Sequence, residues 1–392
     1  MSRYGDPKTK KDAHGNERIE CLECGSFYHR LDVHLNSKHK MSPEDYQAKH
    51  PGAPVLSEHA METSSSDVKA PAPAKRVATK PKDTTPKTPA NIYKIGVARL
   101  ERRSDISAEA KTFIPEHQEN WLPGSREKQQ LEDLAVGMED GENVLLVGPT
   151  GCGKSTLVQQ LASACQQPLF RTNLHGDVRA ADFIGEKLVE VDEGSGQSVV
   201  VWKDGLLPQA MRHGYWLLLD ELDAAPASIL FVLQAVLEDG GKLVLTGNGG
   251  EVIPKHPNFR IIATANTLGR GDETGLYTGT HILNEAFLDR LGVVIDSGYP
   301  NPETERRILE ERCNVVPDVA KRMVEVAAQI REAYDREECF CTFSTRRLIA
   351  WATKTNRYGS ATRAAKVTCL NKLSGDDAKL VAGIIQRHFD GK

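Results

Sequence analysis

Several features are missing from this 392-residue sequence, and each absence excludes a class of protein. It has no apolar run of about 18 residues, which excludes a membrane-spanning helix. Residues 1–20 are polar and lack the apolar core of a secretory signal, so we expect a cytoplasmic protein. The formal net charge is only −4, too small for a global field that would draw the chain to DNA or to a membrane.

The eight cysteines do not have the pattern of a disulfide framework. Cys21 and Cys24 have the spacing of metal ligands, Cys152 lies in a glycine-rich motif, and the others are scattered. This distribution indicates a reducing compartment.

Large apolar side chains are almost missing from residues 61–90, where Pro, Ala, Lys, Ser and Thr dominate. Such a stretch cannot bury enough apolar area to offset the entropy of ordering it. We therefore expect a small module over residues 1–56, a disordered linker over 57–94, an α/β core over 95–300 and a helical lid domain over 301–392.

The core shows short apolar runs that alternate with helical patterns. The segments NVLLV, YWLLLD, FRIIATAN and GVVID predict four strands, with helices between them. Buried strands that alternate with helices predict a doubly wound parallel α/β sheet. After Pro302 the pattern becomes helical, which predicts an all-α domain.

The segment GPTGCGKST follows the first strand and opens a helix. Its glycines let backbone N–H groups converge on phosphate oxygens, and the start of the helix adds the positive end of its dipole. We expect Lys154 to reach the β and γ phosphates of ATP and Ser155 to ligate Mg²⁺. The predicted nucleotide-binding loop comprises Gly148, Pro149, Thr150, Gly151, Cys152, Gly153, Lys154, Ser155 and Thr156.

Polar side chains end the two following strands. Asp220 is expected to hold the Mg²⁺ shell and Glu221 to take a proton from the attacking water. Asn266, at the end of the next strand, can orient that water. Arg290 could stabilise transition-state charge in a neighbouring subunit, and Arg346 could touch the nucleotide of its own subunit.

Arg347 is the rival of Arg346 for this last role, and the sequence leaves the choice between them open.

The chain thus carries five elements in order: the phosphate loop, the acidic pair, Asn266, Arg290 and Arg346. They resemble the Walker A, Walker B, sensor 1, arginine finger and sensor 2 elements of the AAA+ ATPases. Two predicted hairpins narrow the resemblance. One surrounds Gly194-Ser195-Gly196 and the other is GKLVLTGNGGEVIP, and hairpins at these places resemble the MoxR branch.

The segments RTNLHGDVRAADFIGE, DELDAAPASILFVLQAVLEDGGKLVL and ATANTLGRGDETGLYTGTHILNEAFLDRLGVVI are similar to the CobS-type ATPase subunit of aerobic cobaltochelatase. The resemblance covers roughly residues 110–355. It implies a hexameric ring driven by ATP, a partner protein with a von Willebrand A domain, and remodelling of a third component. In the cobalt case that component inserts metal into a corrin ring, but GDETGLYTGT offers no metal-ligand constellation here.

Near the N-terminus, Cys21, Cys24, His34 and His39 follow the pattern C-x2-C-x9-H-x4-H. Two thiolates and two imidazoles can close a tetrahedron around Zn²⁺, and a module this small benefits from a metal. The nine-residue gap and the following MSPEDYQAKHP resemble the Ros/MucR-type finger. The Ser-Pro opening of that segment predicts the cap of another helix.

The finger's binding partner stays open between protein and nucleic acid. The Ros/MucR resemblance implies DNA binding, but residues 1–50 hold nine Lys/Arg and eight Asp/Glu, without a clear basic stripe. Our first hypothesis is a MoxR/CobS-like ATPase whose finger recruits a client or adaptor. The alternative is a zinc-finger DNA-associated factor with a nucleotide-gated assembly switch, and a DNA-translocating motor ranks below both.

Overall fold

The computed structural model describes residues 9–11, 17–28, 31–51, 53–56, 91–191, 196–267, 283–373 and 375–389. The chain forms two compact units, Met1–Thr85 and Pro86–Lys392. Most of the predicted linker, residues 57–90, lies outside the described residues, as does the segment GDETGLYTGT.

The first unit is a small antiparallel sheet with short helices. Ile19, Cys21, Leu31, Leu35, Tyr46 and Ala53 form its buried core. Ser42 caps the last helix by accepting a hydrogen bond from Asp45 N, so the helix predicted from the Ser-Pro opening is confirmed. The elements are β1 (Thr9–Lys11), β2 (Glu17–Glu20), β3 (Phe27–Tyr28), α1 (Leu31–His34), the π-helical turn η1 (Leu35–His39) and α2 (Pro43–Lys49).

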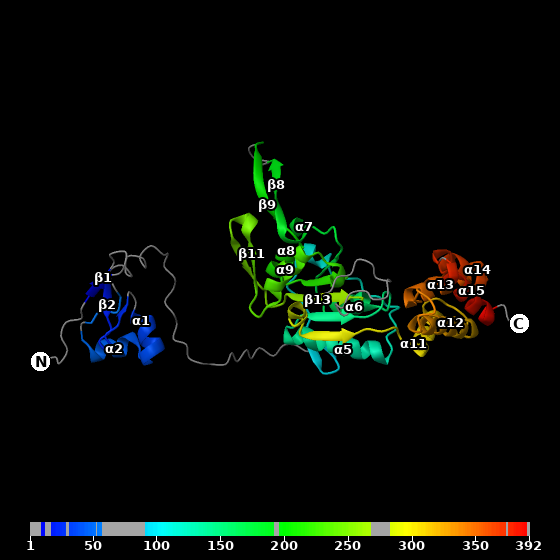
Figure 1. The fold of residues 1–392 in the computed structure, drawn as a ribbon, viewed down its shortest axis with the longest axis horizontal. Coiled ribbons are helices and arrows are strands. Elements are labelled where there is room, and N and C mark those ends of the chain that lie inside the picture. Colours follow the sequence, from blue (N-terminus) through cyan, green and yellow to red (C-terminus); the bar gives the residue numbers. More distant parts are fainter. Residues whose placement is uncertain are drawn as a thin grey trace. The chain divides into compact units, whose positions relative to one another are not determined.

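The second unit is built on a five-stranded parallel sheet in the order β14-β6-β13-β10-β7. Strand β13 of this sheet is labelled in Figure 1. All four predicted strands are present, and the fifth, in PLFRTN, was missed because only two apolar residues open it. The strands are β6 (Val144–Val147), β7 (Leu169–Asn173), β10 (Trp216–Asp220), β13 (Arg260–Ala265) and β14 (Val293–Asp296).

Helices cover both faces of this sheet. Alternate residues of the strands enter two separate cores: Leu145 and Leu217 belong to one, and Val144 and Leu218 to the other. The first core includes α8 (Leu206–His213) and α9 (Ala227–Leu237), and the second includes α5 (Ser125–Asp140) and α6 (Lys154–Ala164). The predicted doubly wound α/β fold is therefore confirmed.

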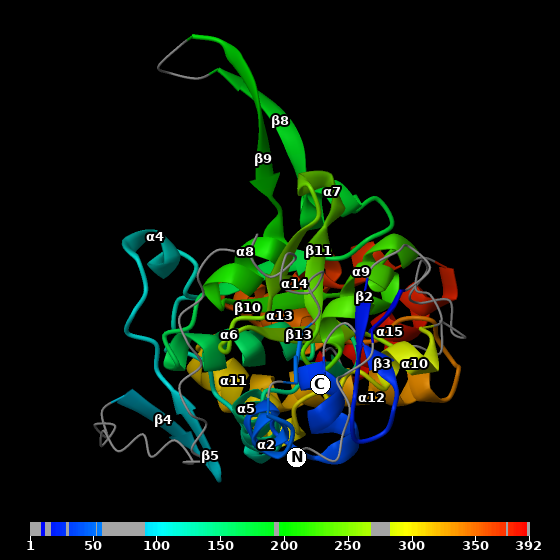
Figure 2. The ribbon, with the colours of Figure 1, turned by 90° about the vertical axis from the view of Figure 1, so that its left-hand side faces the viewer.

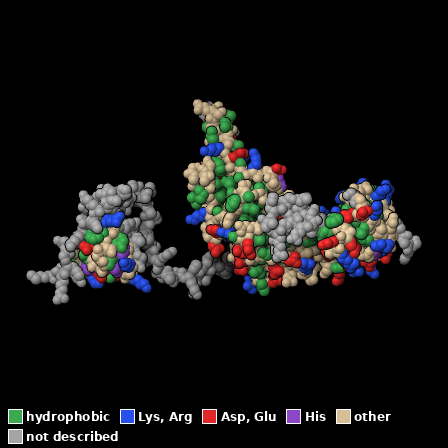
Figure 3. Space-filling model, viewed as in Figure 1, with side chains coloured by type: hydrophobic (Ala, Val, Ile, Leu, Met, Phe, Trp, Pro, Cys, Tyr) green, Lys and Arg blue, Asp and Glu red, His purple; other side chains and the backbone are tan. Residues whose placement is uncertain are grey.

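Within the described part of the second unit, three β-hairpins extend from the core or pack on it. The two predicted ones are present as β8 (Gly185–Val191) with β9 (Ser198–Asp204), and β11 (Lys242–Leu245) with β12 (Glu251–Pro254). Residues 192–195 of the first turn, including Gly194 and Ser195, lie outside the described residues. The hairpin β8–β9 projects from the core (Figure 2), and hydrophobic side chains lie on its surface (Figure 3).

The third hairpin, β4 (Ile92–Ile95) with β5 (Ala98–Glu101), packs on α5, where Glu132 and Glu139 accept its backbone N–H groups. The described residues of the core also form the short helices α4 (Ala108–Lys111), α7 (Ala180–Ile184) and α10 (Glu285–Leu288).

The chain ends in the predicted all-α part, which has its own core around the fully buried Trp351 and Met323. Its helices are α11 (Pro302–Glu311), α12 (Pro317–Asp335), α13 (Thr345–Tyr358), α14 (Ala361–Thr368) and α15 (Gly375–Phe389). Across the described ranges, no helix combines the length and apolarity needed to cross a membrane.

Candidate nucleotide site and candidate metal centre

The phosphate loop, residues 148–156, connects β6 to α6 and packs closely on two neighbours. A Cβ on Gly148 would lie 1.8 Å from Ser297 O, so this position requires glycine. Gly151 has a φ of +72°, and its missing side chain leaves room for Ser344. The loop is thus held between the end of β14 and the start of α13.

Lys154 is buried at the first turn of α6. Its Nζ donates to Gly148 O at 2.5 Å, to Pro149 O at 3.1 Å and to Asn266 Oδ1 at 3.1 Å. Burial lowers the pKa of Lys154, while nearby acidic groups oppose that shift. The structure therefore brings the predicted phosphate-binding lysine and Asn266 into direct contact.

Asp220 ends β10, and its carboxylate accepts three hydrogen bonds. Ser155 Oγ donates to its Oδ1 at 2.6 Å, and Thr264 Oγ1 donates to the same atom at 2.9 Å. Arg171 Nε, from β7, donates to Oδ2 at 2.5 Å. Ser155 and Asp220 are the predicted Mg²⁺ ligands. Thr264 and Arg171 come from two other strands, and no sequence motif marks them.

Glu221 follows Asp220 in a left-handed conformation, with a φ of +60°. A non-glycine residue in this conformation is uncommon and is typical of functional sites. Its backbone N donates to Thr264 Oγ1 at 3.3 Å, and its side chain is exposed at the cavity edge. A solvated carboxylate is suited to accept a proton from water.

Asp223 is an additional residue of the site that the sequence analysis missed. It is fully buried, and its Oδ2 accepts hydrogen bonds from Asn266 N at 3.0 Å, Thr267 N at 2.9 Å and Thr267 Oγ1 at 3.0 Å. Asp223 therefore fixes the backbone that presents Asn266. The only sign of Asp223 in the sequence is that it is the third acidic residue of the segment DELD.

Two adjoining cavities lie along the phosphate loop. The first, of about 280 Å³, lies between the core and the helical part, and residues such as Trp121, Ile308 and Ile349 line it. The second, of about 560 Å³, is polar and is lined by Asp220, Glu221 and Asn266 among others. Thr150 to Thr156 all line at least one of the two cavities.

The two candidate arginines at the start of α13 differ in their surroundings. Arg346 lines both cavities. Arg347 Nη1 instead donates to Thr342 O at 3.0 Å, and its guanidinium lies over the Phe343 ring. The geometry favours Arg346 as the residue that meets a nucleotide.

Arg290 lies outside both cavities. Its Nη2 is 2.8 Å from Glu238 Oε1, and its guanidinium also donates to Ala286 O. Asn143 Nδ2 donates to the backbone carbonyls of Arg290 and Leu237, at 3.2 Å and 3.1 Å. Arg290 therefore lies at the edge of the sheet where the parallel strands begin, opposite the edge that carries the phosphate loop. It does not reach the nucleotide cavities of its own chain.

In the first unit, Cys21, Cys24, His34 and His39 converge, with all four ligand atoms within 4.8 Å of one another. His34 Nε2 lies 3.2 Å from His39 Nε2 and 3.3 Å from Cys24 Sγ, and Cys21 Sγ lies 3.7 Å from His39 Nε2. Zn²⁺ with bonds of ~2.3 Å to sulfur and ~2.0 Å to nitrogen places neighbouring ligand atoms roughly 3.3–3.8 Å apart. The predicted ligands therefore fit a tetrahedral zinc site.

Neighbouring groups support this cluster. The Tyr28 ring stacks on His34 with centroids 4.1 Å apart, and the Tyr46 hydroxyl accepts a hydrogen bond from Leu22 N at 2.9 Å. Burial opposes ionisation of the Cys24 thiol, but hydrogen bonds from Ser26, His39 and His34 outweigh it and lower its pKa to about 6. A thiolate is the form that binds zinc.

Comparison with known families agrees with this geometry. Residues 143–290 match the model of the AAA domain (dynein-related subfamily), and residues 305–387 match that of the CbbQ/NirQ/NorQ C-terminal domain. Residues 5–64 match the ROS/MUCR transcriptional regulator protein family. The chain is 32% identical over 309 residues to the aerobic cobaltochelatase subunit CobS of Sinorhizobium sp. This alignment covers 78% of this chain and 91% of that protein.

The chain belongs to the MoxR-type AAA+ ATPases. Within this family it is also 31% identical over 256 residues to the denitrification regulatory protein NirQ of Pseudomonas aeruginosa, covering 64% of this chain and 91% of that protein. Its identity to the protein NorQ of Paracoccus denitrificans is 31% over 243 residues, covering 62% and 83% respectively. The resemblances noted from the sequence, to AAA+ ATPases and to Ros/MucR fingers, are confirmed.

This MoxR-type ATPase is an enzyme that hydrolyses ATP, and its AAA+ domain implies bound nucleotide with Mg²⁺. The oxygen ligands that Mg²⁺ prefers are present, because the Ser155 hydroxyl and the Asp220 carboxylate meet beside Lys154. The ROS/MUCR match and the converging cysteines and histidines make the first unit compatible with Zn²⁺.

Proposed function

We propose that this ATPase works as a cytoplasmic, hexameric ring that couples ATP hydrolysis to the remodelling or activation of a partner protein complex. Insertion of a metal ion by that complex, as the name of the CobS relative describes for that protein, is one downstream task that the proposal accommodates. The zinc finger recruits the client or an adaptor.

In the proposed mechanism the phosphate loop and Lys154 bind the β and γ phosphates, and Ser155 and Asp220 hold Mg²⁺. When bound, Mg²⁺ supplies positive charge to the phosphate oxygens. Asn266, anchored by Asp223, orients the attacking water. Glu221 accepts the proton of that water at its carboxylate as the oxygen attacks the γ-phosphorus and the bond to ADP breaks.

The position of Arg290 is the observation that supports assembly into a ring. Four of the five predicted elements meet at the two cavities, whereas the fifth, Arg290, is held outside them by Glu238 and Asn143. An arginine on the surface of one subunit can reach the γ-phosphate of the next, which supplies transition-state charge stabilisation in trans. A single subunit is therefore an incomplete enzyme in this proposal.

The projecting hairpin β8–β9 supports a partner-binding role. Val189 and Val200 pair across it and are 71% and 67% exposed. Exposed apolar side chains on a projecting element favour a contact with another protein. We propose that the hairpins face a client, or a partner with a von Willebrand A domain, and that six tethered fingers strengthen weak contacts through avidity.

The proposal is tested by measuring ATP turnover and mass in solution for the purified full-length chain, with and without duplex DNA. We expect a ring with ATP turnover that duplex DNA does not change. A monomer that hydrolyses ATP as fast as any larger species would contradict the proposal.

The match of residues 5–64 to a family of transcriptional regulators favours a second candidate function. In this alternative the chain is a zinc-finger DNA-associated factor, and nucleotide binding gates its assembly. It predicts salt-sensitive DNA binding. If DNA stimulates turnover and Cys21→Ser abolishes the stimulation, the alternative is correct and the finger is a DNA sensor.

A further inference from the structure

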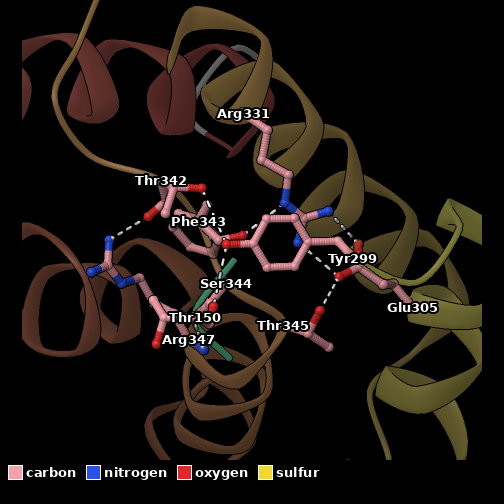
Figure 4. Close-up of polar contacts among 9 residues, drawn as sticks. All are labelled: Thr150, Tyr299, Glu305, Arg331, Thr342, Phe343, Ser344, Thr345 and Arg347. Carbon is pink, nitrogen blue, oxygen red and sulfur yellow. Dashed lines mark hydrogen bonds and ion pairs between the residues drawn. The ribbon is translucent and has the colours of Figure 1, made fainter. Parts of the chain in front are cut away.

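A polar network connects the phosphate loop with the helical part of the second unit (Figure 4). It begins at Tyr299, in the segment that joins β14 to α11. The Tyr299 hydroxyl donates to Thr150 O of the phosphate loop at 3.3 Å, and it lies 3.3 Å from Thr342 Oγ1. A tyrosine hydroxyl keeps its proton at neutral pH, and burial raises the pKa of Tyr299 still further.

The aromatic ring of Tyr299 contacts the next residue of the network, Arg331. The Arg331 guanidinium, from α12, lies 4.1 Å above the ring centroid, a distance at which a cation and an aromatic face attract each other. Its two terminal nitrogens donate to both carboxylate oxygens of Glu305 on α11, at 2.8 Å and 2.9 Å. Its Nε donates to Phe343 O at 2.8 Å.

Glu305 is 1% exposed, so its charge is removed from water. Besides Arg331, the Thr345 hydroxyl donates to Glu305 Oε1 at 2.6 Å. A buried ion pair contributes little net stability compared with apolar residues of similar size, but it requires one fixed geometry. The pair is therefore better suited to fix an orientation than to stabilise the fold.

The network converges on the first turn of α13. Thr345 bonds to Glu305, and the carbonyls of Thr342 and Phe343, just before the helix, accept from Arg347 and Arg331. The missing side chain of Gly151 lies against this turn, because a Cβ there would be 2.9 Å from Ser344 Cβ and 3.4 Å from Arg346 Cβ. Arg346 is thus presented to the cavities by a turn that is fixed on both sides.

We propose that Tyr299, Arg331 and Glu305 form a brace that positions Arg346 relative to the phosphate loop, with the Tyr299 hydroxyl as its link to that loop. These are positioning residues, since they line neither of the two cavities described above. The brace would transmit a shift of the phosphate loop to the helical part and back. The inference rests on the proposed role of Arg346.

The test is Tyr299→Phe in the full-length protein, which removes the hydroxyl and keeps the ring beneath Arg331. We expect ATP turnover to fall roughly three- to tenfold, as for the loss of one or two hydrogen bonds, and the melting temperature to fall by no more than about 4 °C. Tyr358→Phe is the matched control, because the Arg363 guanidinium lies 4.8 Å above its ring, at the far end of α13. It should keep wild-type turnover.

A cycle with Arg346→Ala separates positioning from a general structural role. We expect Arg346→Ala to lower turnover strongly and Tyr299→Phe to add little in that background. If Tyr299→Phe lowers turnover by the same factor in the wild-type and Arg346→Ala backgrounds, the brace is refuted. It is also refuted if Tyr299→Phe lowers turnover in neither background. In both cases the ATPase function stands. If Arg346→Ala leaves turnover at the wild-type level, the role of Arg346 is wrong and the brace is overturned with it.

Should Tyr299→Phe lower the melting temperature by more than this, Thr342→Val provides a second test of the same link. It removes the hydroxyl that lies 3.3 Å from Tyr299 and leaves Thr342 O free to accept from Arg347. The brace predicts a smaller loss of turnover that again vanishes with Arg346→Ala. An equal loss in both backgrounds would contradict it.

Discussion

Asp223 offers a test of how the nucleotide site is assembled. The change Asp223→Ala removes the acceptor of three hydrogen bonds, two from backbone N–H groups and one from the Thr267 hydroxyl. Each hydrogen bond to a charged group contributes about 1.5–3 kcal/mol. Removal of a buried charge with one unpaired oxygen offsets part of this loss. We therefore expect the free energy of unfolding to fall by about 2–4 kcal/mol.

The same change should affect catalysis, because Asn266 N is one of the three donors. A displacement of the Asn266 side chain of about 1 Å would lower turnover roughly 10- to 100-fold. Asp223→Asn keeps one carbonyl acceptor, so its losses should be smaller in both measurements. The exposed Asp335, at the end of α12, gives the control Asp335→Ala, which should change neither.

Urea unfolding measures the stability of the second unit, and steady-state phosphate release measures turnover. A lower stability with turnover within twofold of wild type would refute the positioning of Asn266 by Asp223. Unchanged stability would refute the three hydrogen bonds themselves.

Two further predictions concern hydrolysis and the metal. Glu221→Gln should retain ATP in equilibrium binding but lower turnover by about 10²–10⁴-fold, because the amide cannot take a proton; loss of ATP binding would show that Glu221 acts in nucleotide binding instead. Removal of zinc with a chelator, or Cys24→Ser, should unfold the first unit, since structural zinc contributes about 10–16 kcal/mol. The melting of the second unit should stay unchanged, because the two units are separately compact. Dispersed amide signals of residues 17–56 after zinc removal would contradict the metal site.

The parts of the fold that the sequence predicted are those encoded locally. An apolar run followed by GPTGCGKST defines a strand, a loop and a helix in one segment. The spacing of Cys21, Cys24, His34 and His39 likewise lies within one short segment, so its convergence could be foreseen. The strand β7 was missed because Arg171 and Thr172 interrupt its apolar pattern after Phe170.

Residues that act through strand pairing could not be predicted. Arg171 and Thr264 reach Asp220 only because β7 and β13 lie on either side of β10, and strand order is not visible in a local pattern. The choice between Arg346 and Arg347 depends on the rotation of α13, since neighbours on a helix point about 100° apart. Gly151, almost two hundred positions earlier, and Glu305 contact the first turn of α13 and hold that rotation.

The proposed completion of each site by Arg290 of the next subunit can be tested by mixing two inactive variants. Glu221→Gln subunits keep Arg290, and Arg290→Ala subunits keep Glu221, so a mixed ring contains sites with both groups. We predict that each variant alone has almost no turnover and that the mixture recovers part of it. A mixture that stays as inactive as its components, although mixed rings have formed, would show that Arg290 does not act on the neighbouring site.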